Sequence, residues 1–85
     1  MEITMSDLNK SVKELDLDWV PVASSNIKQL AWDDNELFVQ FNSGKVYSYL
    51  DVFESTFEQL VSAKSVGSFF STEIKPNFTC WDWNL

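Results

Sequence analysis

Apolar and polar side chains alternate with a period of two between residues 22 and 50, which is the period of a half-buried β-strand. Three runs rich in β-branched and aromatic residues predict strands at about 27–32, 37–41 and 46–50. The polar run at 33–36 predicts the first turn, and the run at 42–45, which contains Gly44, predicts the second. The pattern therefore predicts a three-stranded antiparallel β-meander with short connections.

After the third strand the apolar positions recur at helical spacing. One helix is predicted over about 53–64, because four apolar residues fall on one face, namely Phe53, Phe57, Leu60 and Val61. A shorter helix is predicted over 66–74, with Ser65 as its N-cap and Pro76 as its stop. These patterns predict that a long and a short C-terminal helix cover the sheet.

The two ends of the chain carry their own patterns. A short N-terminal amphipathic helix is predicted over 6–15, because three apolar residues share one face, namely Leu8, Val12 and Leu15. The aromatic tail is expected to pack on the same domain as the sheet. The fold class is therefore α+β, and the chain divides into a leading segment at 1–21, a domain at 22–78 and a tail at 79–85.

Composition excludes most catalytic chemistry. Among 85 residues there are 13 acids and 6 bases, which gives a net charge of −7; all six bases are lysine, and histidine is absent. Without imidazole or guanidinium groups the chain offers no ordinary general base, and Cys80 alone forms neither an intrachain disulfide nor a zinc cluster. We therefore expect no catalytic residue, no metal site and no cofactor. The run at 24–26, Ser-Ser-Asn, is predicted to be a turn held by side-chain hydrogen bonds.

The sequence also carries expectations about location. The first residues lack a basic region followed by an apolar stretch, so we expect no signal peptide. No apolar run approaches the roughly 18 residues that a transmembrane helix needs. We therefore expect a cytoplasmic protein, in a bacterium or an infected host, with no membrane contact.

Short motifs spread over 22–78 resemble the KTSC domain family: Ser-Asn-Ile before the first strand, Tyr-x-Tyr in the third, and then Ser-x-Gly, Phe-Phe and Ile-Lys at 65–75. This family occurs at the C-terminus of some lysyl-tRNA synthetases and as small stand-alone bacterial and phage proteins. RNA binding has been suggested for it. The resemblance implies an RNA-binding domain, although Ile74-Lys75 stands where the family usually has Ile-Arg.

Charge favours a different kind of partner. Within 22–78 four lysines stand against seven acids, so we expect no basic face, and phosphate neutralisation is the main source of nucleic-acid affinity. We predict a non-enzymatic protein-binding module, an inhibitor or adaptor of phage type that docks on a basic, nucleic-acid-handling protein. The candidate partner-binding residues are two acidic stretches and two tryptophans, Glu14, Asp16, Asp18, Asp33, Asp34, Glu36, Trp81 and Trp83.

Each candidate also has a structural interpretation that the sequence leaves open. The acids at 33–36 suit a solvated turn, and the two tryptophans suit a core as well as an exposed anchor. The alternative function is RNA binding, with bases stacked on Tyr47 and Tyr49 and phosphates near Lys45 and Lys75. Packing of the same two tyrosines under the predicted helices is the interpretation that the sequence favours. Oligomeric state is not predicted.

Overall fold

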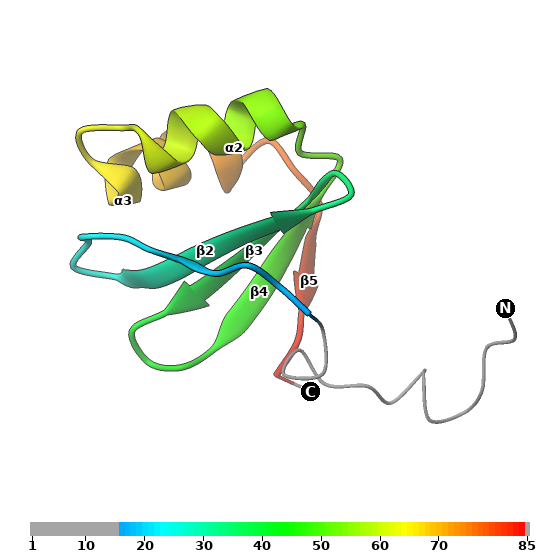
Figure 1. Cartoon of the computed structure of the whole chain (residues 1–85), viewed down its shortest axis with the longest axis horizontal. Helices are drawn as coiled ribbons and strands as arrows, with labels where there is room; N and C mark the ends of the chain where they lie inside the picture. The colour runs from blue at the N-terminus through cyan, green and yellow to red at the C-terminus, as the bar shows by residue number, and fades with distance from the viewer. Residues whose placement is uncertain (1–15, 85) are drawn as a thin grey trace, which may run out of the picture.

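A computed structural model of the chain describes residues 16–84 as one antiparallel sheet with helices packed on one face (Figure 1). The sheet has five strands in the order β1-β2-β3-β4-β5. The strands are β1 (Val20–Pro21), β2 (Ile27–Asp33), β3 (Glu36–Phe41), β4 (Val46–Leu50) and β5 (Cys80–Asp82). The helices are α2 (Glu54–Val61), α3 (Val66–Phe69) and the π-helix η2 (Phe70–Ile74).

The three central strands form the predicted meander, within a residue of the predicted bounds. The β2–β3 turn places Asp34 and Asn35 at φ 48° and 63°, the left-handed pair that a two-residue hairpin of type I′ requires. The β3–β4 turn has Gly44 at φ 96°, a conformation that glycine adopts without steric cost. Both turns are therefore set by local residue chemistry.

The prediction of three strands was wrong, because two short edge strands complete the sheet. In β1, Val20 pairs with Leu30 and Pro21 with Gln29. The tail supplies β5, in which Trp81 lies opposite Ser48. Strands of two and three residues are too short for an alternating pattern to reveal them. The helix predicted at 6–15 lies outside the described residues.

The helices differ in detail from the sequence prediction. α2 begins at Glu54 and ends at Val61, so it is shorter than the predicted segment at both ends. The predicted helix at 66–74 consists of α3 and the π-helical η2. Its predicted N-cap is confirmed, because Ser65 Oγ accepts a hydrogen bond of 3.2 Å from the Ser68 N–H.

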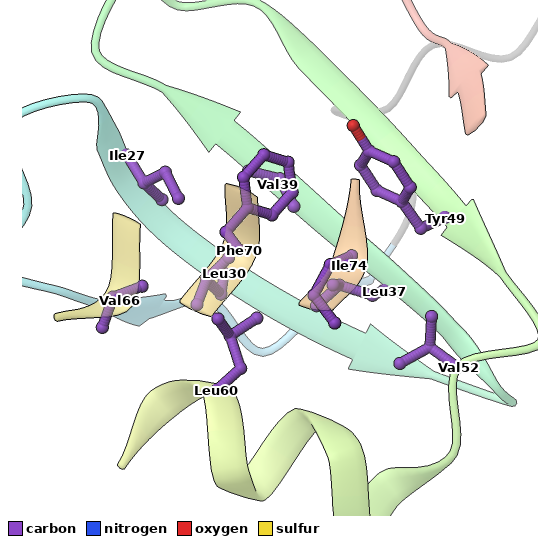
Figure 2. Packing of buried hydrophobic residues seen from close by; sticks show 10 residues of the cluster. All are labelled: Ile27, Leu30, Leu37, Val39, Tyr49, Val52, Leu60, Val66, Phe70 and Ile74. Atoms are coloured by element: carbon purple, nitrogen blue, oxygen red, sulfur yellow. The ribbon is translucent and has the colours of Figure 1, made fainter. Parts of the chain in front are cut away.

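The main core lies between the sheet and the helices, and Figure 2 shows ten of its buried residues. Leu60 of α2 and Ile74 of η2 are fully buried against it. Phe70 meets Tyr49 edge to face at a centroid distance of 5.3 Å. The Trp32 indole N–H donates to the Val52 carbonyl at 2.7 Å, which ties β2 to the chain that leads into α2.

The face of the sheet away from the helices is partly covered by the tail. Phe38 is 3% exposed there, and its ring centroid lies 5.9 Å from that of Trp83. The Asn84 side chain accepts from the Val46 N–H and donates to the Val46 carbonyl, so it extends the ladder beyond β5. The tail is therefore an integral part of the sheet. No helix in the part of the chain that the structure describes is long and apolar enough to cross a membrane.

Candidate functional site

Acidic side chains gather at the end of the sheet where β2 turns into β3. Asp33 pairs with Glu36 across the turn, with Asp34 between them. The Val52 N–H donates to the Asn35 carbonyl at 2.9 Å, which brings the β4–α2 connection to the same end. That connection adds two further acids and the exposed Phe53, at Asp51, Phe53 and Glu54. The structure thus gathers carboxylates that the sequence places in two separate segments.

Two exposed apolar side chains adjoin these acids on the open face of the sheet. Leu50 lies directly opposite Glu36, and Trp81 is the diagonal neighbour of Leu50 because it lies opposite Ser48. Leu50 is 38% exposed and Trp81 is 56% exposed. We call this the acidic anchor surface, and it comprises Asp33, Asp34, Glu36, Leu50 and Trp81.

The remaining partner-binding candidates lie elsewhere. Asp16 and Asp18 are exposed and precede β1, which is at the opposite edge of the sheet from β5. Glu14 lies outside the described residues. Trp83 is half-buried, and its indole N–H donates to Ser48 Oγ at 2.9 Å, so it packs as part of the fold. Of the two tryptophans, Trp81 is therefore the one whose side chain is mostly exposed to solvent.

The two tyrosines of the RNA-binding alternative lie under the helices. Tyr49 is 4% exposed, and Tyr47 is half-buried with its ring edge against Phe41 at 5.8 Å. The pKa of Tyr49 is raised well above its usual range. Burial is the largest cause, and a hydrogen bond with the Cys80 thiol and the charges of Cys80 and Tyr47 add to it. The Tyr-x-Tyr motif therefore forms an internal wall rather than an open stacking platform.

This wall borders a cavity of about 500 Å³ between the sheet, α3 and η2. Its lining includes four aromatic rings, a lysine and the exposed thiol, Phe41, Tyr47, Tyr49, Phe70, Lys75 and Cys80. Lys45, in the β3–β4 turn, is not part of this lining. Of the four residues of the RNA-binding alternative, three come together around one cavity.

A second cavity, of about 440 Å³, adjoins the first, since both are lined by Asn26, Gly67 and Ser71. Lys64 lines it together with six hydroxyl side chains, Ser24, Ser25, Ser65, Ser68, Ser71 and Thr72. We call the two cavities together the groove. Its walls come from four separate parts of the chain, so the periodicity that located the strands and helices gave no sign of it. The predicted turn at 24–26 is confirmed, because Ser24 Oγ accepts from the backbone N–H groups of Asn26 and Ile27.

Charge is unevenly distributed between the groove and the acidic anchor surface. Lys64 and Lys75 line the groove, and no Asp or Glu does so among the described lining residues. The groove reaches Tyr49 and Cys80, which precede Leu50 and Trp81 in the chain, so the groove and the acidic anchor surface lie on opposite faces of the sheet. Charge totals along a sequence do not record which side chains share a wall, so they could not locate this pair of lysines.

The motifs that form the groove are those of a known family. The sequence matches the KTSC domain over residues 23–78. The chain belongs to the KTSC domain family. It is 37% identical over 60 residues to a protein from Tsukamurella paurometabola, a match that spans 68% of this chain and 90% of that relative. It is also similar to the crystal structure of a KTSC domain protein from Yersinia pestis, with a TM-score of 0.73 and 38% identity over 78% of this chain and 96% of the other.

The side chains that this KTSC domain brings together differ between its two surfaces. Among residues 16–84, no group of three or more potential metal-ligating side chains comes together. Lys64, Lys75 and Asn26 line the groove together with the serines. The chain has no histidine that could activate a serine. The domain presents an aromatic and hydroxyl-lined groove on one face of the sheet and a carboxylate-rich surface with an exposed indole on the other.

Proposed function

We propose that this KTSC protein is a non-enzymatic protein-binding module that docks through its acidic anchor surface on a basic surface of its partner. The observation that carries the proposal is the exposure of Trp81 and Leu50, 56% and 38%, on the sheet face where Leu50 lies opposite Glu36. Tryptophan is enriched among the residues that dominate interface energetics. Apolar contact would supply affinity, and the acids would select a basic partner.

Electrostatics gives this proposal a measurable signature. With a net charge of −7, the protein attracts basic surfaces over a distance of several ångströms, and this attraction acts mainly on the association rate. Salt screens it, with a Debye length of about 8 Å at physiological ionic strength. Binding should therefore weaken as salt rises, mostly through slower association.

A narrower form of the proposal is inhibition of a nucleic-acid-handling protein, as a phage-type antagonist would act. The acids of the surface lie in the β2–β3 turn and at the two strand ends that flank it, and such a cluster of carboxylates offers the same sign of charge as a phosphate backbone. A partner whose basic channel takes nucleic acid would then lose that activity when the domain binds.

Support for the RNA-binding alternative is weaker. Tyr49 is 4% exposed and has little free ring face for a stacked base. Lys45 lies apart from the cavity that Tyr47, Tyr49 and Lys75 line.

Site-specific crosslinking tests the proposed surface. A photoreactive phenylalanine analogue would replace Trp81 in cells that express the protein, and the same analogue at Glu58, an exposed position on α2, serves as the control. We expect the analogue at position 81 to capture a basic protein that the analogue at position 58 does not. Equal capture from both positions would contradict the proposal.

Binding constants with the captured protein complete the test. We expect Trp81→Ala to lose about 2 kcal/mol of binding free energy or more, as hot-spot residues do. The pair Asp33→Asn with Asp34→Asn should slow association, whereas the matched pair Glu58→Gln with Glu73→Gln, which changes the net charge equally, should have a smaller effect. If the two pairs have equal effects, the surface is not specific.

A further inference from the structure

The geometry points to a second binding site: we propose that the groove binds a small phosphate monoester that carries a planar ring, of the size of a mononucleotide. The ring would enter the aromatic cavity, and the phosphoryl group would lie in the hydroxyl-lined cavity. The site lies on the face of the sheet that the helices cover, opposite to the acidic anchor surface, and does not depend on the proposed protein partner.

The volume and lining of the first cavity suit a ring. Its volume of about 500 Å³ lies within the range of roughly 300–1,000 Å³ that small-molecule sites occupy. Phe41, Tyr47 and Phe70 line it, and their rings are already arranged edge to face, with Phe41 at 5.8 Å from both of the others. Phe70 is buried, whereas Phe41 and Tyr47 are half-buried, so a planar ligand that lies against the exposed parts of these two rings gains offset or edge contacts.

The second cavity suits a phosphoryl group. A phosphoryl group carries several acceptor oxygens and up to two negative charges, so it calls for many donors and a positive charge. Six hydroxyl side chains and Lys64 line this cavity, and Lys75 lines the neighbouring one. The Thr72 O–H already donates to the Ser68 carbonyl, so the five serines are the hydroxyl donors left for a ligand. Ser24 Oγ already accepts from two backbone N–H groups, so its own O–H proton remains for a ligand.

The junction between the cavities explains why one ligand would fill both. Asn26, Gly67 and Ser71 line both cavities. A Cβ at Gly67 would lie 3.3 Å from Ser24 Oγ, so glycine allows α3 to approach the turn at 24–26 closely. Tyr49 adds no negative charge to the wall, because a tyrosine phenol is neutral at physiological pH.

Titration of the 15N-labelled protein with adenosine 5′-monophosphate tests the proposal. We expect saturable shifts of the amide signals of groove residues, weaker binding of inorganic phosphate, and weaker binding of adenosine, which lacks the phosphoryl group. Equal binding of adenosine, or no shift with millimolar adenosine 5′-monophosphate, would overturn the proposal. So would equal binding of an RNA oligonucleotide without a terminal phosphate.

Matched charge variants locate the site. We expect Lys64→Ala with Lys75→Ala to weaken binding about tenfold or more, since each removes a charge-assisted contact. The pair Lys28→Ala with Lys45→Ala makes the same change in net charge at lysines outside the lining, and it should leave binding within about twofold. Equal weakening by both pairs would mean that total charge alone governs binding, which contradicts the site.

A substitution at the junction gives an independent check that does not depend on lysine. Ser71 is exposed and lines both cavities, so Ser71→Asp places a negative charge at their junction without disturbing the core. Ser55→Asp, at an exposed position on α2, is the matched control. We expect the first to abolish binding and the second to preserve it, with both variants folded by circular dichroism. Retained binding by Ser71→Asp would overturn the proposal.

Discussion

Trp83 donates its indole N–H to the hydroxyl of Ser48 at 2.9 Å, across the face of the sheet that the helices leave open. Ser48 is fully buried, and it lies in the middle of β4. A buried hydroxyl without a partner costs free energy, so the tail that carries Trp83 completes the hydrogen bonding of the central sheet. The contact spans 35 positions in the sequence.

Removal of one partner of this pair should destabilise the domain. We expect Trp83→Phe to cost about 1–3 kcal/mol of unfolding free energy, because it leaves the Ser48 hydroxyl buried without a partner. Ser48→Ala should cost about 1 kcal/mol, and the double variant should cost less than the sum of the two. Urea unfolding of the four proteins measures this coupling. Strict additivity would show that the hydrogen bond contributes nothing.

The two tryptophans of the tail should differ in their effect on stability. Trp81→Ala is expected to change the unfolding free energy by roughly 0.5 kcal/mol or less, because its side chain is 56% exposed. Trp83→Ala removes the hydrogen bond to Ser48 and the contact with Phe38, so it should destabilise by about 2 kcal/mol or more. Chemical unfolding distinguishes them, and equal losses would contradict the assignment of Trp81 to the surface.

Gly44 should resist substitution for a backbone reason alone. No atom lies within 4 Å of a Cβ built at Gly44, but its φ of 96° disfavours any side chain. We expect Gly44→Ala to cost about 1–2 kcal/mol of unfolding free energy. Gln59→Ala is the control, since Gln59 is an exposed residue of α2, where alanine is the better helix former. Thermal unfolding should show the larger loss for Gly44→Ala.

Alkaline pH should weaken the fold through Tyr49. Its pKa is raised in the folded state, first by burial and then by the Cys80 thiol, whereas the unfolded chain has the ordinary value of about 10. As pH rises above that value, the unfolded state loses a proton that the folded state keeps, so the unfolding free energy falls. We expect Tyr49→Phe to reduce this decline and Tyr47→Phe to preserve it, as measured by urea unfolding between neutral and alkaline pH. The same decline in both variants would contradict this role.

Local pattern predicted the parts of this fold that depend on local chemistry. The central strands follow from alternation, and the N-cap at Ser65 follows from its hydroxyl before a helical stripe. The edge strands escaped prediction because Val20–Pro21 and Cys80–Asp82 pair through a few backbone groups only, and such pairing leaves no periodic signal. The π-helical turn in η2 is likewise invisible to a search for a period of 3.6.

The candidate sites show the same division. Trp81 and the acids at 33–36 could be identified as candidates by residue type. Leu50, which lies between them in the sheet, has the sequence pattern of an ordinary strand residue. Its role arises from register alone, because it lies opposite Glu36 and diagonal to Trp81. The groove is lined by Lys64, Lys75 and serines that are distant in the sequence. Only the tertiary fold brings these residues together.

The sheet order, β1-β2-β3-β4-β5, has a consequence for how this domain is combined with others. Every strand pairs only with its neighbours in sequence, so the described chain enters at one edge of the sheet and leaves at the other. A polypeptide fused before β1 or after β5 would not have to thread between strands. The topology therefore makes the domain portable, able to be joined to an unrelated protein at either edge with its pairing intact.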